Sequence, residues 1–136
     1  MVALVHHWPI RIYYEDTDSG GVVYHSNYLK YMERARTEWL RDFKVDQKAL
    51  KDNLNLMFVV HEIDIKFIRP AVFNDEIEVQ TKLEKLGSVK IELEQKIFRS
   101  TEILIESRVV VALVNSFSMK PMRIPNEIKL LMENEL

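Results

Sequence analysis

Apolar residues recur every three or four positions between Asn27 and Phe43, with charged residues on the other side, and this spacing predicts an amphipathic helix. The stripe consists of Tyr28, Met32, Ala35, Trp39 and Phe43. Ser26 or Asn27 can supply the N-cap oxygen of this helix. A short second helix is expected over Val45–Asn53, capped by Asp46.

Further along the chain the spacing of apolar residues becomes two, which predicts β-strands with one solvent-facing side. Such strands are expected over residues 59–67, 77–84 and 89–97, separated by turn signals such as Arg69-Pro70 and Leu86-Gly87-Ser88. In the first of them, Val59 is expected on the same face as Ile63, Ile65 and Phe67.

A longer strand is expected over residues 103–119, followed by a loop to Pro125 and a closing helix over 126–135. Within this strand Val109–Val114 is apolar on both faces, so the strand is expected to be central in the sheet or covered by another subunit. A short strand is also expected over Ile10–Tyr14. One long helix followed by an antiparallel meander predicts an α+β fold in which the sheet wraps around the helix.

The 136 residues are expected to form a single domain spanning 1–136, because two domains would each be too small to bury a core. A net charge of −2 gives no electrostatic case for binding nucleic acid. The chain has no cysteine, which excludes disulfides and a thiol nucleophile and permits a reducing compartment. The first residues lack the basic start of a signal peptide, and the longest apolar run is far shorter than the ~20 residues of a membrane span. We therefore expect a cytoplasmic location.

Two carboxylates, a glycine pair and a histidine directly precede the predicted long helix. The run Asp-Thr-Asp-Ser-Gly-Gly-Val-Val-Tyr-His-Ser-Asn-Tyr occupies residues 16–28, and Glu-Arg-Ala-Arg follows at 33–36. Gly20-Gly21 allows the backbone to adopt a positive φ and to approach a ligand closely. This long ungapped block resembles the signature of the hot-dog-fold acyl-CoA thioesterases, specifically the 4-hydroxybenzoyl-CoA thioesterase family and its YbgC-like members.

The resemblance spans nearly the whole chain and implies a hot-dog fold and hydrolysis of acyl-CoA or acyl-carrier-protein thioesters. Coenzyme A would be a product, and no cofactor is implied. The two apolar faces of Val109–Val114, together with the sites that this family usually builds between subunits, predict a homodimer or homotetramer.

Thioester hydrolysis needs a carboxylate and hydrogen-bond donors for the developing oxyanion, and a helix N-terminus can supply the donors. By resemblance, Asp18 matches the family's catalytic carboxylate, acting as nucleophile or general base; the alternative is a residue that only shapes an Asx-turn. His25 can bind the thioester or Asp18, orient water or protonate the leaving thiolate, and its backbone amide can be an oxyanion donor.

Tyr14, Glu33 and Arg69 are weaker candidates, whereas Asp16 is left out of the site. The Tyr14 hydroxyl can reach Asp18 or the substrate, as the corresponding tyrosine does in YbgC-like enzymes, or Tyr14 is a core residue at a strand end. Asp16 is interpreted as a turn or strand-end residue. Glu33 is expected in a surface or interface ion pair, and Arg69 is slightly favoured among the cations available for coenzyme A phosphates.

Other motif interpretations fail. Asp16-x-Asp18-x-Gly20 resembles the start of an EF-hand, but the twelfth position is Asn27 rather than glutamate. The four histidines lack zinc-site spacing, so no metal is expected. Two other functions stay open: a hot-dog hydratase or dehydratase, and a non-catalytic module that binds acyl groups or acyl carrier protein.

Overall fold

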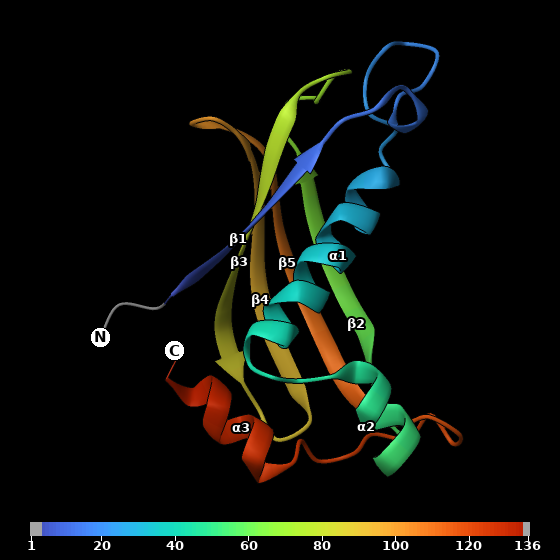
Figure 1. Cartoon of the computed structure of the whole chain (residues 1–136), viewed down its shortest axis with the longest axis vertical. Helices are drawn as coiled ribbons and strands as arrows, with labels where there is room; N and C mark the ends of the chain where they lie inside the picture. Colours follow the sequence, from blue (N-terminus) through green and yellow to red (C-terminus); the bar gives the residue numbers. More distant parts are fainter. Residues whose placement is uncertain (1–3, 135–136) are drawn as a thin grey trace.

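The computed structural model describes residues 4–134, which form one curved antiparallel sheet around one long helix (Figure 1). The helices are α1 (Asn27–Asp42), α2 (Gln47–Leu54) and α3 (Asn126–Glu133). The strands are β1 (Val5–Arg11), β2 (Leu56–Phe67), β3 (Glu76–Leu86), β4 (Lys90–Arg99) and β5 (Glu102–Asn115). The predicted α+β architecture is confirmed.

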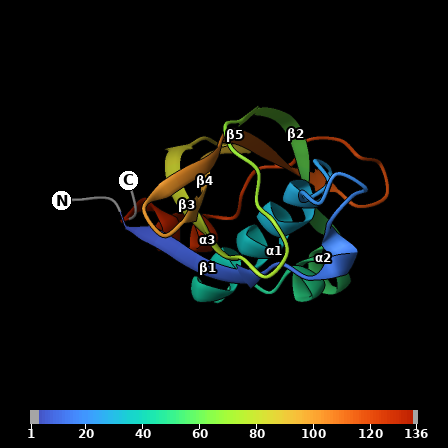
Figure 2. The same ribbon diagram turned by 90° about the horizontal axis from the view of Figure 1, so that it is seen from above.

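The strand order is β1-β3-β4-β5-β2, and every neighbouring pair is antiparallel. Figure 2 shows how the sheet curves so that α1 lies along its concave side. Alternate residues of the inner strands, such as Val79, Leu93 and Val109, meet the buried face of α1 there. The buried residues of that face are Tyr28, Tyr31, Met32, Ala35, Trp39 and Leu40. The helical spacing therefore predicted the helix and most of its buried stripe, although Tyr31 was missed.

A buried glutamine fixes α1 to the sheet. Gln95 on β4 is fully buried, and its side-chain amide donates to the Met32 carbonyl (3.1 Å) and to the Thr81 hydroxyl (2.9 Å). Its side-chain oxygen accepts a hydrogen bond from the Arg36 guanidinium (2.9 Å). Burial lowers the pKa of Arg36, because it disfavours the charged form. These directional contacts fix the rotation and height of the helix, which apolar packing alone leaves free.

A β-bulge changes which side chains of β2 face the helix. The pairing of β2 with β5 shifts between Val60 and Glu62, so one extra residue is inserted at His61. Phe58, Ile63 and Ile65 pack against the core. The expectation that Val59 shares a face with Ile63 was wrong, because the inserted residue reverses the alternation at the bulge.

The first strand was also predicted wrongly. It runs from Val5 to Arg11 rather than over Ile10–Tyr14, and Tyr14 begins a 3₁₀ turn that ends at Asp16. The carboxylate of Asp16 accepts a hydrogen bond from the Tyr13 amide (2.8 Å), which turns the chain away from the sheet. Pro9 is tolerated inside β1 because β1 is an edge strand, where a missing N–H breaks no ladder on the outer side.

The apolar run Val109–Val114 lies on β5, between β4 and β2, and each of its residues is at most 7% exposed. The central position that the sequence predicted is confirmed. Both faces are buried within the single chain, so no second subunit is needed to cover them. β5 ends at Asn115 rather than near residue 119, because the Asn115 side chain accepts hydrogen bonds from the Phe117 and Ser118 amides.

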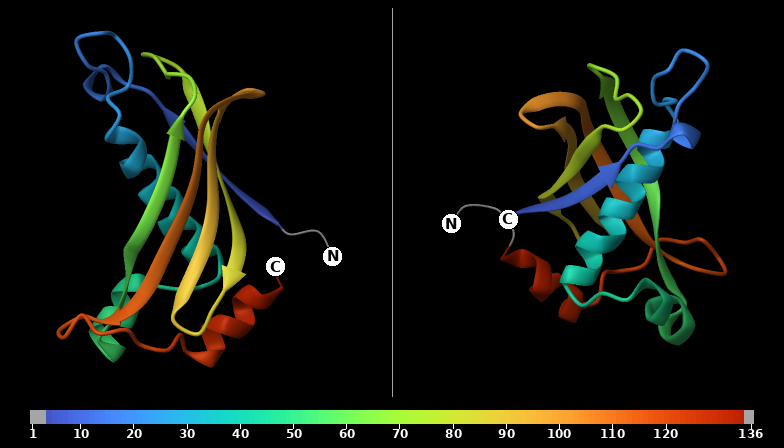
Figure 3. Two further views of the ribbon diagram at one scale, coloured as in Figure 1. Left: turned by 180° about the vertical axis from the view of Figure 1, so that it is seen from behind. Right: turned by 45° about the horizontal axis from the view of Figure 1, so that its top comes forward.

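The two short helices lie at the lower end of the sheet, away from the N-terminus of α1 (Figure 3). Asp46 caps α2 as expected, accepting hydrogen bonds from the Lys48 and Ala49 amides. The closing helix α3 buries Ile128 and Met132, and the predicted helix end at residue 135 lies outside the described residues. None of the helices in residues 4–134 is long and apolar enough to cross a membrane.

Candidate active site

Asp18 lies in a tight hairpin between the 3₁₀ turn and α1. Thr17 pairs with Val23, and the Gly21 amide donates to the Asp18 carbonyl (3.0 Å). Gly21 has a φ of 80°, the left-handed conformation that follows the turn in a three-residue hairpin loop. The predicted positive φ is therefore present at Gly21 but not at Gly20.

The carboxylate of Asp18 forms an Asx-turn, because its Oδ1 accepts a hydrogen bond from the Gly20 amide (2.8 Å). The side chain is exposed, and within residues 4–134 Oδ2 has no hydrogen-bond partner. The turn-shaping role thus occupies one oxygen of this carboxylate and leaves the second available for other contacts.

The N-terminus of α1 has no side-chain cap, so the expectation that Ser26 or Asn27 supplies one was wrong. Ser26 has helical φ and ψ, a conformation in which its hydroxyl does not cap. The Asn27 side chain turns away and donates to the Asp16 carbonyl (2.8 Å). Within the described part of the chain, the amides of His25, Ser26 and Tyr28 donate to no acceptor.

A hollow of about 220 Å³ opens beside these free amides. Its walls are Val23, His25, Tyr28, Phe67, Ile68, Arg69 and Pro70. The exposed His25 ring lies against Tyr24, with 4.5 Å between centroids, and edge-on to Phe67 at 6.3 Å. The Tyr28 hydroxyl accepts a hydrogen bond from the Ala71 amide (3.0 Å), and burial raises the pKa of Tyr28, so Tyr28 is a neutral structural phenol.

The structure does not bring Tyr14 into this hollow. The Tyr14 ring stacks on Phe73, with 3.7 Å between centroids and 6° between planes, and the residue is 73% exposed. Together with Arg11 and Asn74, these two rings line a separate surface depression. His25 lines the hollow, whereas neither Asp18 nor Tyr14 is among its lining residues.

The two charged candidates are engaged within the chain. Arg69 donates to the Glu102 carboxylate (2.5 Å), so its charge is already paired. Glu33 forms no ion pair within residues 4–134; its carboxylate accepts a hydrogen bond from the Thr37 hydroxyl (3.0 Å).

The segment 68–75, which forms one wall of the hollow, is held by Arg99. The Arg99 guanidinium donates to the Asp75 carboxylate (2.6 Å), to the Pro70 carbonyl (3.2 Å) and to the Glu102 carboxylate (3.0 Å). Hydrogen bonds from Arg99 and then from Arg69 lower the pKa of the Glu102 carboxyl. Sequence reasoning missed this cluster, because its members come from three separate segments and share no motif.

Comparison with known proteins shows the family to which this chain belongs. The family model for the thioesterase-like superfamily matches residues 13–130. The chain belongs to this superfamily. The Haemophilus influenzae protein named acyl-CoA thioesterase YbgC is 42% identical over 122 residues, which cover 90% of each chain. Its Helicobacter pylori (strain 26695) counterpart is 38% identical over 88% of this chain and 93% of that protein.

Solved structures of similar proteins have the same fold. The crystal structure of a probable thioesterase from Bartonella henselae is 35% identical and superposes with a TM-score of 0.86, covering 90% of this chain and all of that one. A hypothetical protein from Thermus thermophilus, 27% identical, gives a TM-score of 0.89 over 96% of this chain and 99% of that one. The hot-dog fold that the sequence predicted is confirmed.

The pH dependence of stability should reveal the Arg99 cluster. The pKa of Glu102 is lowered in the folded protein, so its ion pairs stabilise the fold above the unfolded value of about 4.3 and are lost as the pH falls below it. We expect Glu102→Gln to lower Tm near pH 6, with the difference from wild type vanishing towards pH 3. Glu106→Gln on the same strand is the control. Parallel Tm profiles for wild type and Glu102→Gln at all pH values would contradict the assignment.

Proposed function

We propose that this protein hydrolyses acyl-CoA thioesters to a free acid and the thiol of coenzyme A. Membership of the thioesterase-like superfamily and the names of the Haemophilus and Helicobacter relatives support this activity. The observation that carries the proposal is the uncapped N-terminus of α1, whose free amides lie beside the Asp18 hairpin and a hollow. Acyl transfer is promoted by such donors next to a nucleophile or a general base, and a carboxylate can act as either.

In the proposed mechanism the thioester carbonyl oxygen accepts hydrogen bonds from the His25 amide and its neighbours. These donors and the positive end of the helix dipole stabilise the negative charge that develops on that oxygen. Asp18 either attacks the carbonyl carbon, forming an anhydride that water then hydrolyses, or removes a proton from the attacking water. The thiolate leaves in both routes, and the His25 ring can protonate it.

A cavity with several apolar lining residues lies between α1 and β2 and could accommodate the acyl group. This cavity of about 120 Å³ has a floor of Trp39, Leu40, Phe58, Ile91, Leu93 and Val111. Arg36, on its wall, is nine residues from Asn27, or ~13 Å along the helix. We propose that the acyl chain runs from the hollow at the helix N-terminus towards this cavity. Acyl-carrier-protein thioesters are alternative substrates for the same chemistry, and a cytoplasmic location stays a prediction.

The first test is a thiol-release screen over a ladder of acyl-CoA thioesters. We expect Asp18→Asn to lower kcat by about 10²-fold or more with the fold intact, because the amide keeps the shape and removes the base. His25→Ala should cost less if its amide is the oxyanion donor, since alanine keeps that amide. Unchanged turnover in Asp18→Asn would refute the assignment.

Assays on the same protein preparation distinguish a thioesterase from a hydratase and from a non-catalytic binding module. A hydratase would need a histidine with an acidic partner, and within the described residues His25 has no carboxylate at ion-pair distance. Hydration of an enoyl-CoA without thiol release would favour the hydratase. Binding of acyl-CoA without either reaction would favour a non-catalytic module.

Two glycine substitutions test whether the Asp18 carboxylate must keep its position. A Cβ at Gly20 would lie 3.1 Å from Asp18 Oδ1, so we expect Gly20→Ala to displace the carboxylate and lower kcat/KM about tenfold. A Cβ at Gly21 would meet no atom within 4 Å, and its φ of 80° predicts a loss of stability of about 1 kcal/mol for Gly21→Ala. Gly21→Ala should therefore lose stability and keep its rate per folded molecule. Equal rates for both variants would show that the carboxylate position is unimportant.

We also propose a homodimer formed across β2, which could double into a tetramer. β2 is an edge of the sheet, and Val60 and Phe67 on it are 48% and 52% exposed. An edge of 12 residues with exposed apolar side chains is a template for pairing with a second copy. This argument replaces the one from Val109–Val114, whose faces are buried within one chain.

Light scattering should give at least twice the chain mass of 16.1 kDa at micromolar concentration. Val60→Glu places a charge at the bulge of the edge and should shift the protein towards monomer, because like charges would meet across a two-fold axis. Val72→Glu, an exposed valine outside the strands, is the control. A stable and fully active wild-type monomer would contradict the dimer.

A further inference from the structure

The carbonyl oxygen of Asp16 joins the hairpin to the start of α1. It accepts hydrogen bonds from the Tyr24 amide (3.0 Å) and from the Asn27 side chain (2.8 Å). The Asp16 carboxylate accepts a third hydrogen bond, from the Tyr13 amide (2.8 Å). Three segments therefore meet at one residue: the end of the chain from β1, the hairpin that carries Asp18, and the first residue of α1.

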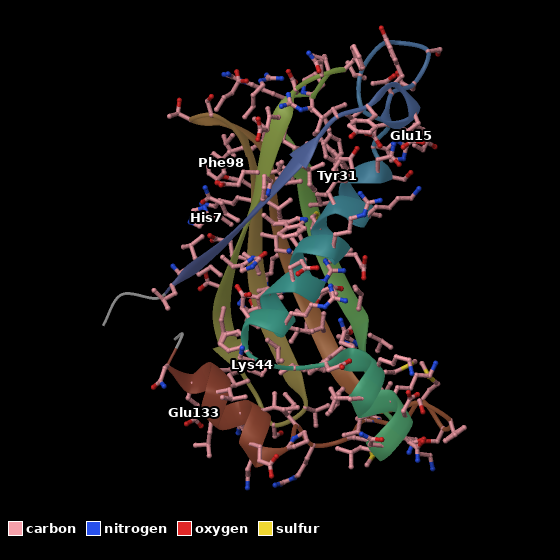
Figure 4. All side chains as sticks on the ribbon, viewed as in Figure 1. His7, Glu15, Tyr31, Lys44, Phe98 and Glu133 are labelled. Atoms are coloured by element: carbon pink, nitrogen blue, oxygen red, sulfur yellow. The ribbon has the colours of Figure 1, made fainter. Side chains whose placement is uncertain are left out.

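Tyr31 is a buried residue on the second turn of the helix. Its side chain is 1% exposed, and its hydroxyl has no hydrogen-bond partner within the described residues. Figure 4 shows Tyr31 on the upper part of α1, near the turn that carries Glu15. Burial and the neighbouring Asp16 carboxylate raise the pKa of Tyr31, so this phenol stays neutral and keeps its proton.

A buried hydroxyl without a partner costs stability, and phenylalanine would fill the same space without that cost. The packing of the core thus does not explain why this position carries a tyrosine. The Asn27 side chain lies at the first residue of the helix, one position past the N-cap, and donates to the Asp16 carbonyl. The Asp16 carboxylate contributes to the raised pKa of Tyr31.

We propose that Asn27 and Tyr31 are positioning residues that act through Asp16 to hold the Asp18 carboxylate at a fixed distance from the free amides of α1. This inference rests on the proposed function, since it assigns Asp18 to the reaction. Asp16 and Asp18 are two residues apart on one arm of the hairpin, so a shift of Asp16 moves Asp18 with it. A displacement of about 1 Å in a catalytic group can cost up to 10²-fold in rate.

A double-mutant cycle between Asn27 and Asp18 tests the proposal. We expect Asn27→Ala to lower kcat about tenfold with KM within about twofold, because binding surfaces are untouched. In the Asp18→Asn background the same substitution should change kcat less than about twofold, since the group that it positions is already gone. Asn27→Asp is made in parallel, because it keeps the size, suits a helix N-terminus and removes the donor. Asn126→Ala, at the first residue of α3, is the matched control and should leave kcat unchanged.

Tyr31→Phe gives a second readout that a structural role would not produce. Removing an unpartnered buried hydroxyl should keep or raise Tm. If the hydroxyl braces Asp16, kcat should nevertheless fall severalfold, again only when Asp18 is present.

The possible outcomes distinguish failure of the catalytic assignment of Asp18 from failure of the positioning role of Asn27 and Tyr31. A wild-type rate in Asp18→Asn would overturn the catalytic assignment whatever the Asn27 variants do. Loss of activity in Asp18→Asn, together with full activity in Asn27→Ala, Asn27→Asp and Tyr31→Phe, would overturn the positioning role alone. Equal rate losses for Asn27→Ala in both backgrounds would also overturn it, because the effect would not pass through Asp18.

Discussion

Burial of one face of α1 against the concave side of the sheet is the interaction on which the rest of the structure depends. Side chains such as Met32 and Trp39 are almost fully buried, and each contributes roughly 1.5–3 kcal/mol relative to an exposed position. Apolar contact has little direction, so the polar contacts of Gln95 with Arg36 and the Met32 carbonyl determine how far the helix is rotated and shifted. The N-terminus of α1 consequently lies at the edge of the sheet rather than inside it.

That placement exposes a helix end which a structure selected for stability alone would cap. A serine cap contributes about 1 kcal/mol, and a serine, Ser26, stands at the N-cap position. Ser26 instead has helical dihedral angles, and the Asn27 side chain binds Asp16. The amides that remain free are the groups that an oxyanion requires, so the stability forgone at this end fits a site whose donors must stay available.

The spacing of apolar residues predicted those features of the fold that depend on burial of apolar side chains. The bounds of α1 were correct to one residue, and the central strand and the wrapping of the sheet around the helix followed from the same pattern. The errors lie where a single hydrogen bond or one inserted residue decides the local path: the bulge at His61, the 3₁₀ turn at Tyr14 and the uncapped helix. Such features depend on hydrogen-bond partners that are distant in sequence, or on neighbouring groups that compete for the same hydrogen bond. The spacing of apolar residues along the chain carries no information about either.

In the candidate site, too, residues within one sequence motif could be predicted, whereas contacts between distant segments could not. Asp18 and His25 came from a contiguous block, so a motif could predict them as candidates, and the hairpin that carries Asp18 is joined to the first residue of α1 by the hydrogen bond from Asn27 to the Asp16 carbonyl. Tyr14 belongs to the same block, yet its ring stacks on Phe73 from the segment after β2, a contact between two loops that the block does not encode. Asn27 was predicted only as a possible N-cap and Tyr31 was not singled out, because their proposed roles depend on what the preceding loop places opposite them.

The two walls of the site are held by different kinds of contact, and this affects how independently they can move. The segment 68–75 depends on partly exposed ion pairs of Arg99, which salt and acid weaken. The hairpin depends on neutral hydrogen bonds to the Asp16 carbonyl, which respond little to either. The Val23 amide links the walls through the Ala71 carbonyl (2.9 Å). Salt and acid should therefore weaken the contacts of the first wall more than those of the hairpin, although the Val23–Ala71 hydrogen bond ties the two walls together.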